Sequence, residues 1–292
     1  MKKCVSCPRA CAVDRALGEV GFCGVGQEYL IGSADLHFWE EPCISGSSGS
    51  GAIFFSGCNL RCVFCQNRQI SRVPCGERWS EDKLIEKMLE LQARGANNIN
   101  LVTPTPYAIL LARTLEKAKP KLNIPIVYNC GGYESLEALR ALDGLVDVYL
   151  PDFKYFSDEL AAAYSSAPNY RSAASAALCE MFRQVGSFAC DKDGIAQKGL
   201  IVRHLVLPAC RADSCAVLEH LAKILPSDKI MLSLMRQYTP EFADPSAPKN
   251  LRRRLTSFEY QSVLDLASSL GFNGFSQQKE SASSVYTPRF NS

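Results

Sequence analysis

From Ala52 onward, short apolar runs alternate with stretches of helical periodicity, and this alternation constrains the fold more than any other feature of the chain. Apolar and β-branched runs predict strands near residues 52–56, 98–103, 124–129, 146–151, 200–207 and 229–235. Strands that alternate with helices build a parallel sheet on which the helices pack. The sequence therefore predicts an α/β fold.

Helical patterns fill the gaps between these strands. Ser80 is placed to cap a helix, because Glu81 and Asp82 follow it and apolar residues then recur at helical spacing. Five later helices are expected, at residues 106–119, 135–142, 170–185, 213–225 and 257–270. The pattern gives about six β/α units, fewer than the eight of a closed barrel. We therefore expect a partial (β/α)6 TIM-like barrel, open on one side, with its active site at the carboxyl ends of the strands.

Two appendages flank the expected barrel. We divide the chain into an N-terminal cysteine-rich, metal-binding segment (1–48), the barrel (49–240) and a C-terminal helical segment with a tail (241–292). Ser45 to Gly51, SGSSGSG, has the composition of a flexible linker but ends directly at a strand. Near the C terminus, Lys249 and Arg252 to Arg254 form a basic run, which is more often a solvated helix start than a nucleic-acid contact.

The composition is that of a globular protein: of 292 residues, 47% are hydrophobic and 21% charged, with a formal net charge of +2. So small a charge predicts neither nucleic acid nor an acidic membrane as partner. No apolar run could span a bilayer and no signal peptide is recognised, so we expect a cytoplasmic protein. Because the cytosol keeps thiols reduced, the 14 cysteines are expected to bind metal or clusters rather than form disulfides.

Three cysteines, Cys58, Cys62 and Cys65, share one loop, GCNLRCVFCQN, directly after an expected strand. Their C-x3-C-x2-C spacing allows the thiolates to bind different corners of one cubane. Structural zinc normally takes four protein ligands, and this loop offers three. Iron–sulfur clusters usually take four thiolates, so three imply an iron with an open position, where a substrate can bind.

This loop, with Phe64 before its last cysteine, resembles the signature of the radical S-adenosylmethionine (SAM) superfamily. The resemblance implies that its cysteines are the catalytic ligands of a [4Fe–4S] cluster and that SAM chelates the open iron. Reductive cleavage of SAM would give methionine and a 5′-deoxyadenosyl radical, which takes hydrogen from the substrate. The protein would position the reactants and exclude water.

The chain also resembles uncharacterised homologues of the pyruvate formate-lyase activating enzyme, through CPRACAVDR, NINLVTPTPY, VYLPDFKY, IVRHLVLP and SLMRQYTP. In the superfamily a Gly-Gly-Glu motif holds the SAM amino group. The matching place here reads Val102-Thr103-Pro104-Thr105, so backbone carbonyls and the hydroxyls of Thr103 and Thr105 would substitute for it.

Further cofactor-binding residues are expected at later strand ends. By the same resemblance, Asp152 and Lys154 would lie near the SAM carboxylate and ribose, and Arg203 near the carboxylate. Charges at the carboxyl ends of barrel strands favour this reading over surface ion pairs. Asn129, at the end of its strand, is a candidate for the ribose. His204 adjoins Arg203 but should point to the opposite face, which favours a structural role.

Four more cysteines, Cys4, Cys7, Cys11 and Cys23, occupy the first residues of the chain. Their spacing suits either a tetrahedral zinc or a second cubane, and either would stabilise a segment with almost no hydrophobic core. A zinc ribbon more often has two C-x2-C pairs, and this array has one, so we favour a second Fe–S cluster over zinc, with free thiols third.

Three functions are compatible with these features. The first is an oxidoreductase of the activase or maturase kind, which makes a radical on a protein or peptide and receives electrons from a reducing flavodoxin or ferredoxin. It predicts a lateral groove, with the N-terminal cysteine segment as a lid or docking element. The second is radical chemistry on a small molecule, which a closed barrel mouth would favour. The third is a non-catalytic zinc-binding module.

Overall fold

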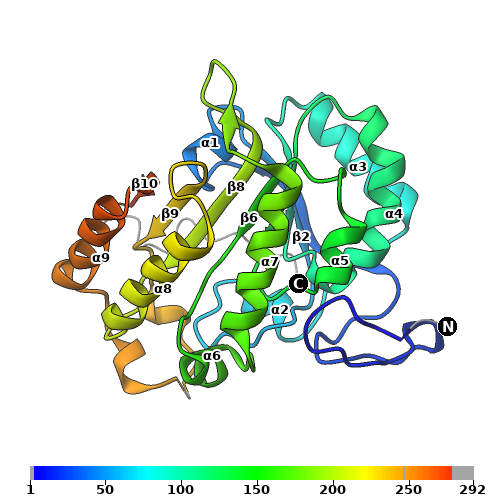
Figure 1. Ribbon diagram of the computed structural model, residues 1–292. Helices are drawn as coiled ribbons and strands as arrows, with labels where there is room; N and C mark the ends of the chain where they lie inside the picture. The colour runs from blue at the N-terminus through cyan, green and yellow to red at the C-terminus, as the bar shows by residue number, and fades with distance from the viewer. Residues whose placement is uncertain (1–2, 246, 278–292) are drawn as a thin grey trace.

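The computed structural model describes residues 3–245 and 247–277, which form a curved ten-stranded sheet with helices along its outer face (Figure 1). The strand order is β10-β9-β8-β6-β5-β4-β2-β1-β3, and the short β7 pairs with β8. The strands are β1 (Tyr29–His37), β2 (Ser50–Phe55), β3 (Glu77–Trp79), β4 (Ile99–Val102), β5 (Ile126–Cys130), β6 (Val148–Pro151), β7 (Ala189–Cys190), β8 (Ala196–Leu205), β9 (Met231–Met235) and β10 (Asn273–Ser276).

The predicted α/β partial barrel is confirmed. Strands β2, β4, β5, β6, β8 and β9 run parallel and lie where the sequence predicts strands. Phe54 pairs with Val102, and Val102 with Asn129, so these strands end at a common edge. Over the described residues the outermost strands β3 and β10 do not pair with each other, and the sheet stays open.

Four strands were not predicted. β1 and β3 extend the sheet antiparallel beyond β2, and β10 adds a parallel strand beside β9, whereas β7 forms only a short hairpin with β8. In β1 only Tyr29 and Ile31 are buried, so the strand has no strong apolar pattern. The sheet therefore runs across both of the segment boundaries expected near residues 48 and 240.

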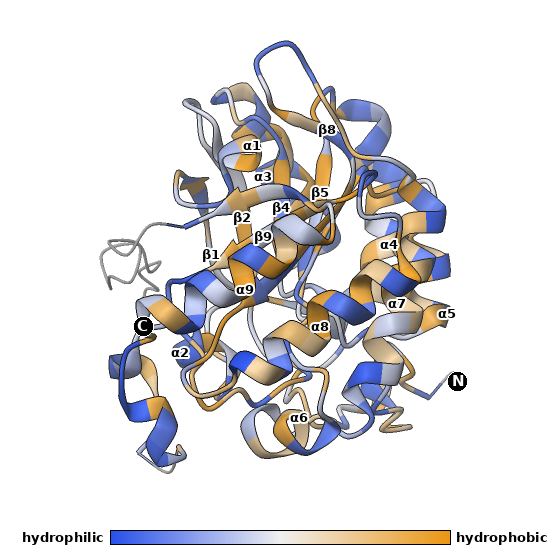
Figure 2. Ribbon diagram, turned by 60° about the vertical axis from the view of Figure 1, so that its left-hand side comes forward, coloured by the Kyte–Doolittle hydropathy of each residue, from blue (hydrophilic) through white to orange (hydrophobic). Residues whose placement is uncertain are grey.

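The expected helices are present within a few residues of their predicted bounds. They are α3 (Glu81–Ala93), α4 (Ala108–Ala118), α5 (Leu136–Ala141), α7 (Tyr170–Val185), α8 (Arg211–Ile224) and α9 (Ser257–Ser269); α1 (Pro42–Ser45), α2 (Arg68–Ser71) and α6 (Asp158–Ser165) were not predicted. The Ser80 hydroxyl caps α3 by accepting from the Lys83 N–H at 3.2 Å. In Figure 2 the helices alternate between apolar and polar residues, as helices with one face on a sheet do.

The SGSSGSG run is ordered. It begins at the last residue of α1, whose Cys43 and Ile44 pack against Val127 and Val148. Its small residues allow close contact, since a Cβ on Gly51 would lie 2.9 Å from the Asn98 carbonyl oxygen. Composition alone suggested a flexible linker, whereas the run connects the buried helix α1 to strand β2.

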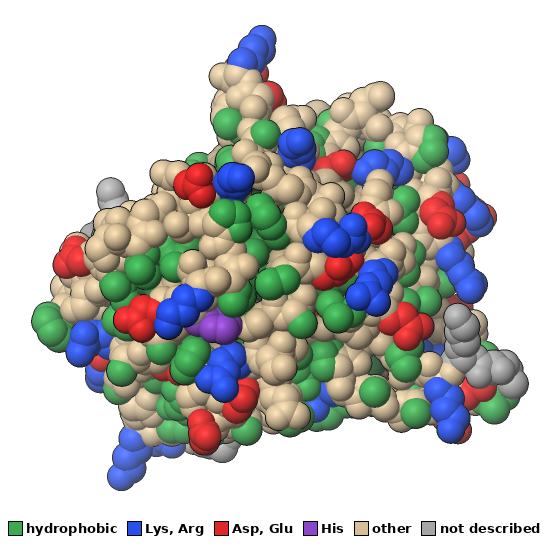
Figure 3. Space-filling view, in the orientation of Figure 1, with side chains coloured by type: hydrophobic (Ala, Val, Ile, Leu, Met, Phe, Trp, Pro, Cys, Tyr) green, Lys and Arg blue, Asp and Glu red, His purple; other side chains and the backbone are tan. Residues whose placement is uncertain are grey.

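Charges of both signs are interspersed on the face shown in Figure 3. In the C-terminal basic run, Arg253 pairs with Glu259 and Arg254 with Glu241. Acidic neighbours thus balance two of the arginines, as expected for a solvated helix start. Within the described ranges, the helices are too short or too polar to cross a bilayer.

Candidate cluster and cofactor site

A cavity of about 230 Å³ lies at the carboxyl ends of the parallel strands. One wall is the cluster loop, defined here as residues 57–67, and another comes from the ends of β4, β5, β6 and β8. The segment between β1 and α1 contributes Trp39 and Glu40. Because Trp39 is 58% exposed, the cavity reaches the molecular surface.

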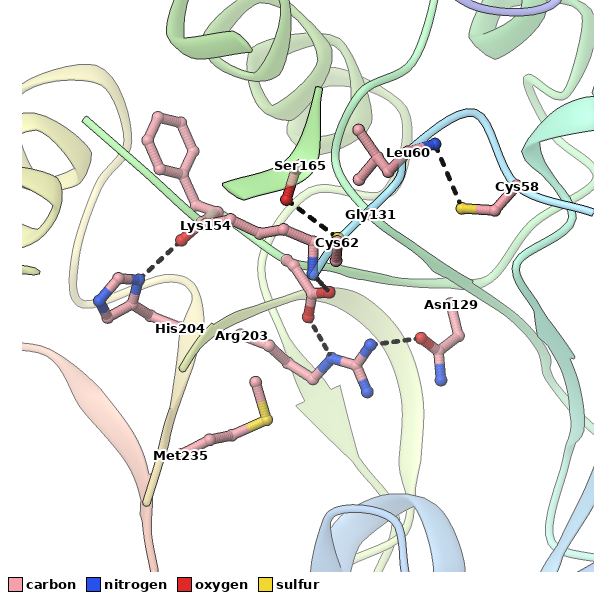
Figure 4. Close-up of polar contacts among 12 residues, drawn as sticks. Cys58, Leu60, Cys62, Asn129, Gly131, Lys154, Ser165, Arg203, His204 and Met235 are labelled. Carbon is pink, nitrogen blue, oxygen red and sulfur yellow. Dashed lines mark hydrogen bonds and ion pairs between the residues drawn. The ribbon is translucent and has the colours of Figure 1, made fainter. Parts of the chain in front are cut away.

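Cys58, Cys62 and Cys65 all line this cavity, and each sulfur has a polar neighbour. The Leu60 N–H donates to Cys58 Sγ at 3.4 Å, and the Ser165 hydroxyl donates to Cys62 Sγ at 3.0 Å (Figure 4). Cys65 Sγ lies 3.4 Å from Ser71 Oγ. Hydrogen bonds to sulfur stabilise a thiolate, so the donors from Leu60 and Ser165 favour anionic sulfurs at Cys58 and Cys62.

The donor set fits a cluster with three protein ligands. Burial raises the pKa of the Cys58 and Cys62 thiols, while the nearby Lys154 charge opposes this rise. A metal centre would supply further positive charge and stabilise the thiolates. Within the described residues, no three or more Cys, His, Asp or Glu side chains are close enough to hold a single metal ion. The thiolates of a cubane bind different irons, so the fit depends on three adjacent thiols rather than on convergence at one point.

Asp152 organises the charges opposite the cluster loop. Its Oδ2 lies 2.5 Å from Lys154 Nζ, and its Oδ1 accepts from Arg203 Nε at 2.9 Å (Figure 4). Burial alone would raise the pKa of Asp152, but the charges of Arg203 and Lys154 outweigh it and hold the pKa below the usual value. All three line the cavity, so the structure brings these predicted residues together.

Asn129 and Glu40 extend this network. Arg203 Nη2 donates to Asn129 Oδ1 at 2.5 Å. Glu40 is held more loosely, with 3.5 Å to Arg203 Nη1 and 3.4 Å to Asn129 Nδ2. Burial raises the pKa of Glu40, and Arg203 only partly opposes this. The sequence analysis missed Glu40, and its only signal was a charged residue two positions before the proline that begins α1.

Thr103 and Thr105, the expected substitutes for the Gly-Gly-Glu motif, lie in different surroundings. Thr103 lines the cavity with a φ of +59°, a strained value for a β-branched residue. Thr105 is fully buried outside the cavity lining, and its hydroxyl donates to Glu134 Oε1 at 2.7 Å. His204 is also outside the lining, with Nδ1 2.7 Å from the Phe153 carbonyl oxygen, in keeping with a structural role.

The N-terminal cysteines lie apart from the cavity. Burial, and then the nearby Glu134, Cys23 and Cys11, raise the pKa of the Cys7 thiol to about 12, so three of the four thiols share one neighbourhood. The Cys4 thiol lies 4.0 Å from Ser6 Oγ. A second cluster or zinc on this group stays a prediction.

The part of the chain that carries the N-terminal cysteines does not line the cavity. In the described chain, none of the lining residues precedes His37. The four N-terminal cysteines are therefore outside the lining, whereas His37, Trp39 and Glu40, which also belong to the segment expected at residues 1–48, are part of it. A role of this segment as a lid or docking element stays a prediction.

Two sequence comparisons are informative. The family model described as the Radical SAM superfamily matches residues 52–192. An uncharacterized protein of Methanocaldococcus jannaschii is 32% identical over 276 residues, which cover 91% of this chain and 74% of that protein. Both matches include the cluster loop and the strand ends up to β6.

Two solved structures are similar in fold. One is Streptococcus suis SuiB bound to the precursor peptide SuiA, with a TM-score of 0.53, 11% identity, and coverage of 76% of this chain and 46% of that chain. The other is a radical SAM methyltransferase from Sphaerobacter thermophilus, with a TM-score of 0.51, 14% identity, and coverage of 77% and 66%. The chain thus spans about half the length of SuiB. At these identities the likeness concerns the fold alone.

Proposed function

The chain belongs to the radical SAM superfamily, and we propose that it cleaves SAM reductively and uses the product radical to abstract hydrogen from a protein or peptide. Membership implies a [4Fe–4S] cluster and SAM as cofactors. When bound, the cluster supplies the electron that breaks a carbon–sulfur bond of SAM. The observation that carries the proposal is one cavity that joins three thiols to a buried Asp-Lys-Arg network.

Each side chain has a distinct part in this proposal. Cys58, Cys62 and Cys65 would ligate the cluster. Lys154 and Arg203 place positive charge opposite the thiolates, where the SAM carboxylate would also be attracted, and Asp152 fixes both cations.

The remaining contacts would come from neutral groups. Asn129 offers an amide and Thr103 a hydroxyl or carbonyl to SAM, because both line the cavity. Thr105 lies outside the cavity lining and would act indirectly, because its hydroxyl donates a hydrogen bond to Glu134.

A protein or peptide substrate is favoured because the cavity opens at an exposed aromatic side chain rather than inside a closed barrel. The activase-like class is suggested by the sequence resemblance to pyruvate formate-lyase activating enzymes. SuiB, which has a similar fold, was solved with a precursor peptide bound. The electron donor would be a reducing flavodoxin or ferredoxin.

The chemistry can be tested without knowing the substrate. The chain is reconstituted anaerobically with iron and sulfide, reduced with dithionite and supplied with SAM. We expect 5′-deoxyadenosine from the wild type and none from the Cys58→Ala, Cys62→Ala, Cys65→Ala variant. A wild type that carries about four irons or more per chain but makes no 5′-deoxyadenosine would refute the proposal.

The substrate class needs a second assay. Cell extract is divided by ultrafiltration, and each fraction is added to the SAM-cleavage reaction. We expect the retained fraction to stimulate cleavage and to lose this effect after protease treatment. Stimulation by the filtrate alone would indicate a small-molecule substrate.

A further inference from the structure

Residues 3–28, here called the N-terminal segment, pack against the cluster loop. In Figure 1 the segment lies below α5, beside the end of the barrel. It contributes nothing to the described cavity lining, yet three separate contacts join it to the backbone that carries the cluster cysteines.

The first contact is made by Arg9. Its Nε donates to the Asn59 carbonyl oxygen at 2.6 Å, and its Nη2 donates to the Ser166 carbonyl oxygen. Asn59 follows the first cluster cysteine. Ser166 follows Ser165, whose hydroxyl donates to Cys62 Sγ. One guanidinium thus joins the cluster loop to the end of helix α6, where Ser165 lies.

The second contact is the ring of Phe22, which two guanidiniums contact. Arg9 Cζ is 3.3 Å from the ring centroid, and Arg61 Cζ is 4.6 Å from it. Arg61 stands between Cys58 and Cys62 in the loop. It donates to the Phe22 carbonyl oxygen at 2.5 Å and to the Ser71 carbonyl oxygen at 3.0 Å.

This arrangement places two like charges close together: burial lowers the pKa of the Arg9 guanidinium, and the nearby Arg61 charge adds to this effect. Directional hydrogen bonds and ring contacts therefore have to maintain it. An incidental surface contact would give no reason for two arginines to share one ring.

The third contact is a close approach of backbones at Gly57. A Cβ there would lie 2.7 Å from the Cys23 carbonyl oxygen and 2.4 Å from Val25 Cγ1, and its φ is +79°. The residue before the first cluster cysteine thus touches the N-terminal segment directly.

We propose that the N-terminal segment positions the cluster loop through the stack of Arg9, Phe22 and Arg61. The proposal rests on the proposed function, since it assumes a cluster on Cys58, Cys62 and Cys65. The stack fixes the carbonyls of Asn59 and Ser166, and through them the hydrogen bond from Ser165 to Cys62. Hydrogen bonds to cluster sulfurs tune the reduction potential, so the stack sets how readily the cluster accepts an electron.

The test compares Arg9→Ala and Arg9→Lys with Arg68→Ala in the reconstituted full chain. Arg68 lies on α2, just beyond the cluster loop, and its side chain is exposed, so its removal is a charge-matched control. We measure iron content, the EPR spectrum of the reduced cluster, its midpoint potential, and hydrogen exchange of residues 57–67.

We expect Arg9→Ala to keep its iron, to shift the potential and EPR spectrum, and to exchange faster in the cluster loop. Arg9→Lys keeps the charge but loses the planar guanidinium. Its midpoint potential and its exchange rate in the cluster loop should therefore lie between those of Arg9→Ala and the wild type. Phe22→Leu, which keeps both arginines, should shift the same readouts in the same direction.

Values for Arg9→Ala equal to those for Arg68→Ala would overturn the proposal, because the segment would then be an independent unit. A thermal unfolding scan identifies a variant that has simply unfolded, and in that case Arg9→Lys and Phe22→Leu decide the question. If even the wild type takes up no cluster, the proposed function fails, while hydrogen exchange of residues 57–67 still reports whether the stack holds the loop.

Discussion

Asp152 is the residue on which the cavity depends most directly, because it holds two buried cations at once. Its carboxylate contacts Lys154 and Arg203, and the side chains of all three are less than 20% exposed. Removing one partner of a buried charge pair leaves the other without compensation. A change here should therefore affect the proposed SAM contacts more than the sulfur ligands.

We predict that Asp152→Asn and Lys154→Ala weaken SAM binding while the cluster absorbance stays nearly unchanged. A hydrogen bond to a charged group is worth roughly 1.5–3 kcal/mol, so the affinity should fall by about tenfold or more. Equilibrium titration with SAM measures the change, and the exposed pair partner Arg78→Ala is a suitable control. Wild-type affinity in both variants would mean that the two residues form an ion pair with no part in binding.

Glu134 is a single buried residue through which the folding stability is expected to depend on pH. Burial raises its pKa to about 7 from a usual value of 4.5, although hydrogen bonds from Thr105 and Tyr128 oppose this. Its protonated form is therefore favoured by folding. The resulting stability is fully present below about pH 4.5 and is lost as the pH rises through about 7.

We predict that Glu134→Gln removes this dependence. The free energy of unfolding of the wild type, relative to the variant, should decrease between about pH 5 and about pH 8. Urea unfolding of both chains at the two pH values, without metal, measures the difference. Parallel changes in the two chains would show that Glu134 does not titrate in this range.

The cavity residues differ in how far the sequence reveals them. Asp152 and Arg203 follow or end apolar runs, and strand ends have a fixed place in a barrel, so their meeting could be predicted. Glu40 reaches the same cavity from a segment between β1 and the four-residue α1, neither of which has a periodic signal. Thr103 and Thr105 are two residues apart, but the strained turn at Thr103 separates their surroundings.

Among the elements, the short helix α6 connects the outer layer to the cluster loop. It ends at Ser165, whose hydroxyl lies 2.7 Å from Tyr155 Oη and donates to Cys62 Sγ. The helix was not predicted, because its eight residues carry only a few buried side chains. The longer helices α3 and α7 were predicted well, since several turns of apolar periodicity mark them.

We predict that Ser165→Ala lowers the reduction potential of the cluster without loss of iron. A hydrogen bond to sulfur stabilises the more negative, reduced form, so its removal makes reduction harder. Redox titration followed by EPR measures the shift, and Ser172→Ala on the neighbouring α7 serves as a serine control. An unchanged potential with normal iron content would show that the Ser165 hydroxyl does not contact the sulfur in the loaded protein.

At the scale of the whole molecule, the two cysteine groups occupy separate places. Cys58, Cys62 and Cys65 line the cavity, whereas Cys7, Cys11 and Cys23 gather in the N-terminal segment. This separation is in keeping with the prediction of two independent metal sites. The sequence allowed this separation to be predicted, since more than 30 residues divide the groups, but not the direct packing of one group behind the other.

We predict that replacing Cys58, Cys62 and Cys65 together with Ala removes the SAM-binding cluster and leaves any N-terminal metal in place. Metal analysis of the variant beside the wild type measures both sites, and SAM cleavage should be absent. Complete loss of iron and zinc would mean that the chain holds one cluster only. Continued SAM cleavage by this variant would show that these cysteines do not hold the cluster that cleaves SAM.

The contacts of the N-terminal segment also fix when it can dock during synthesis. The Val5 carbonyl oxygen accepts from Ser135, and Arg9 donates to Ser166, so its partners lie 130 and 157 residues later in the chain. A ribosome adds about 5–20 residues per second, so the first cysteines are synthesised roughly 7 to 30 seconds before these two partners of the segment. In that interval the emerging thiols are open to metal carriers and to oxidants, before docking brings the segment against the cluster loop.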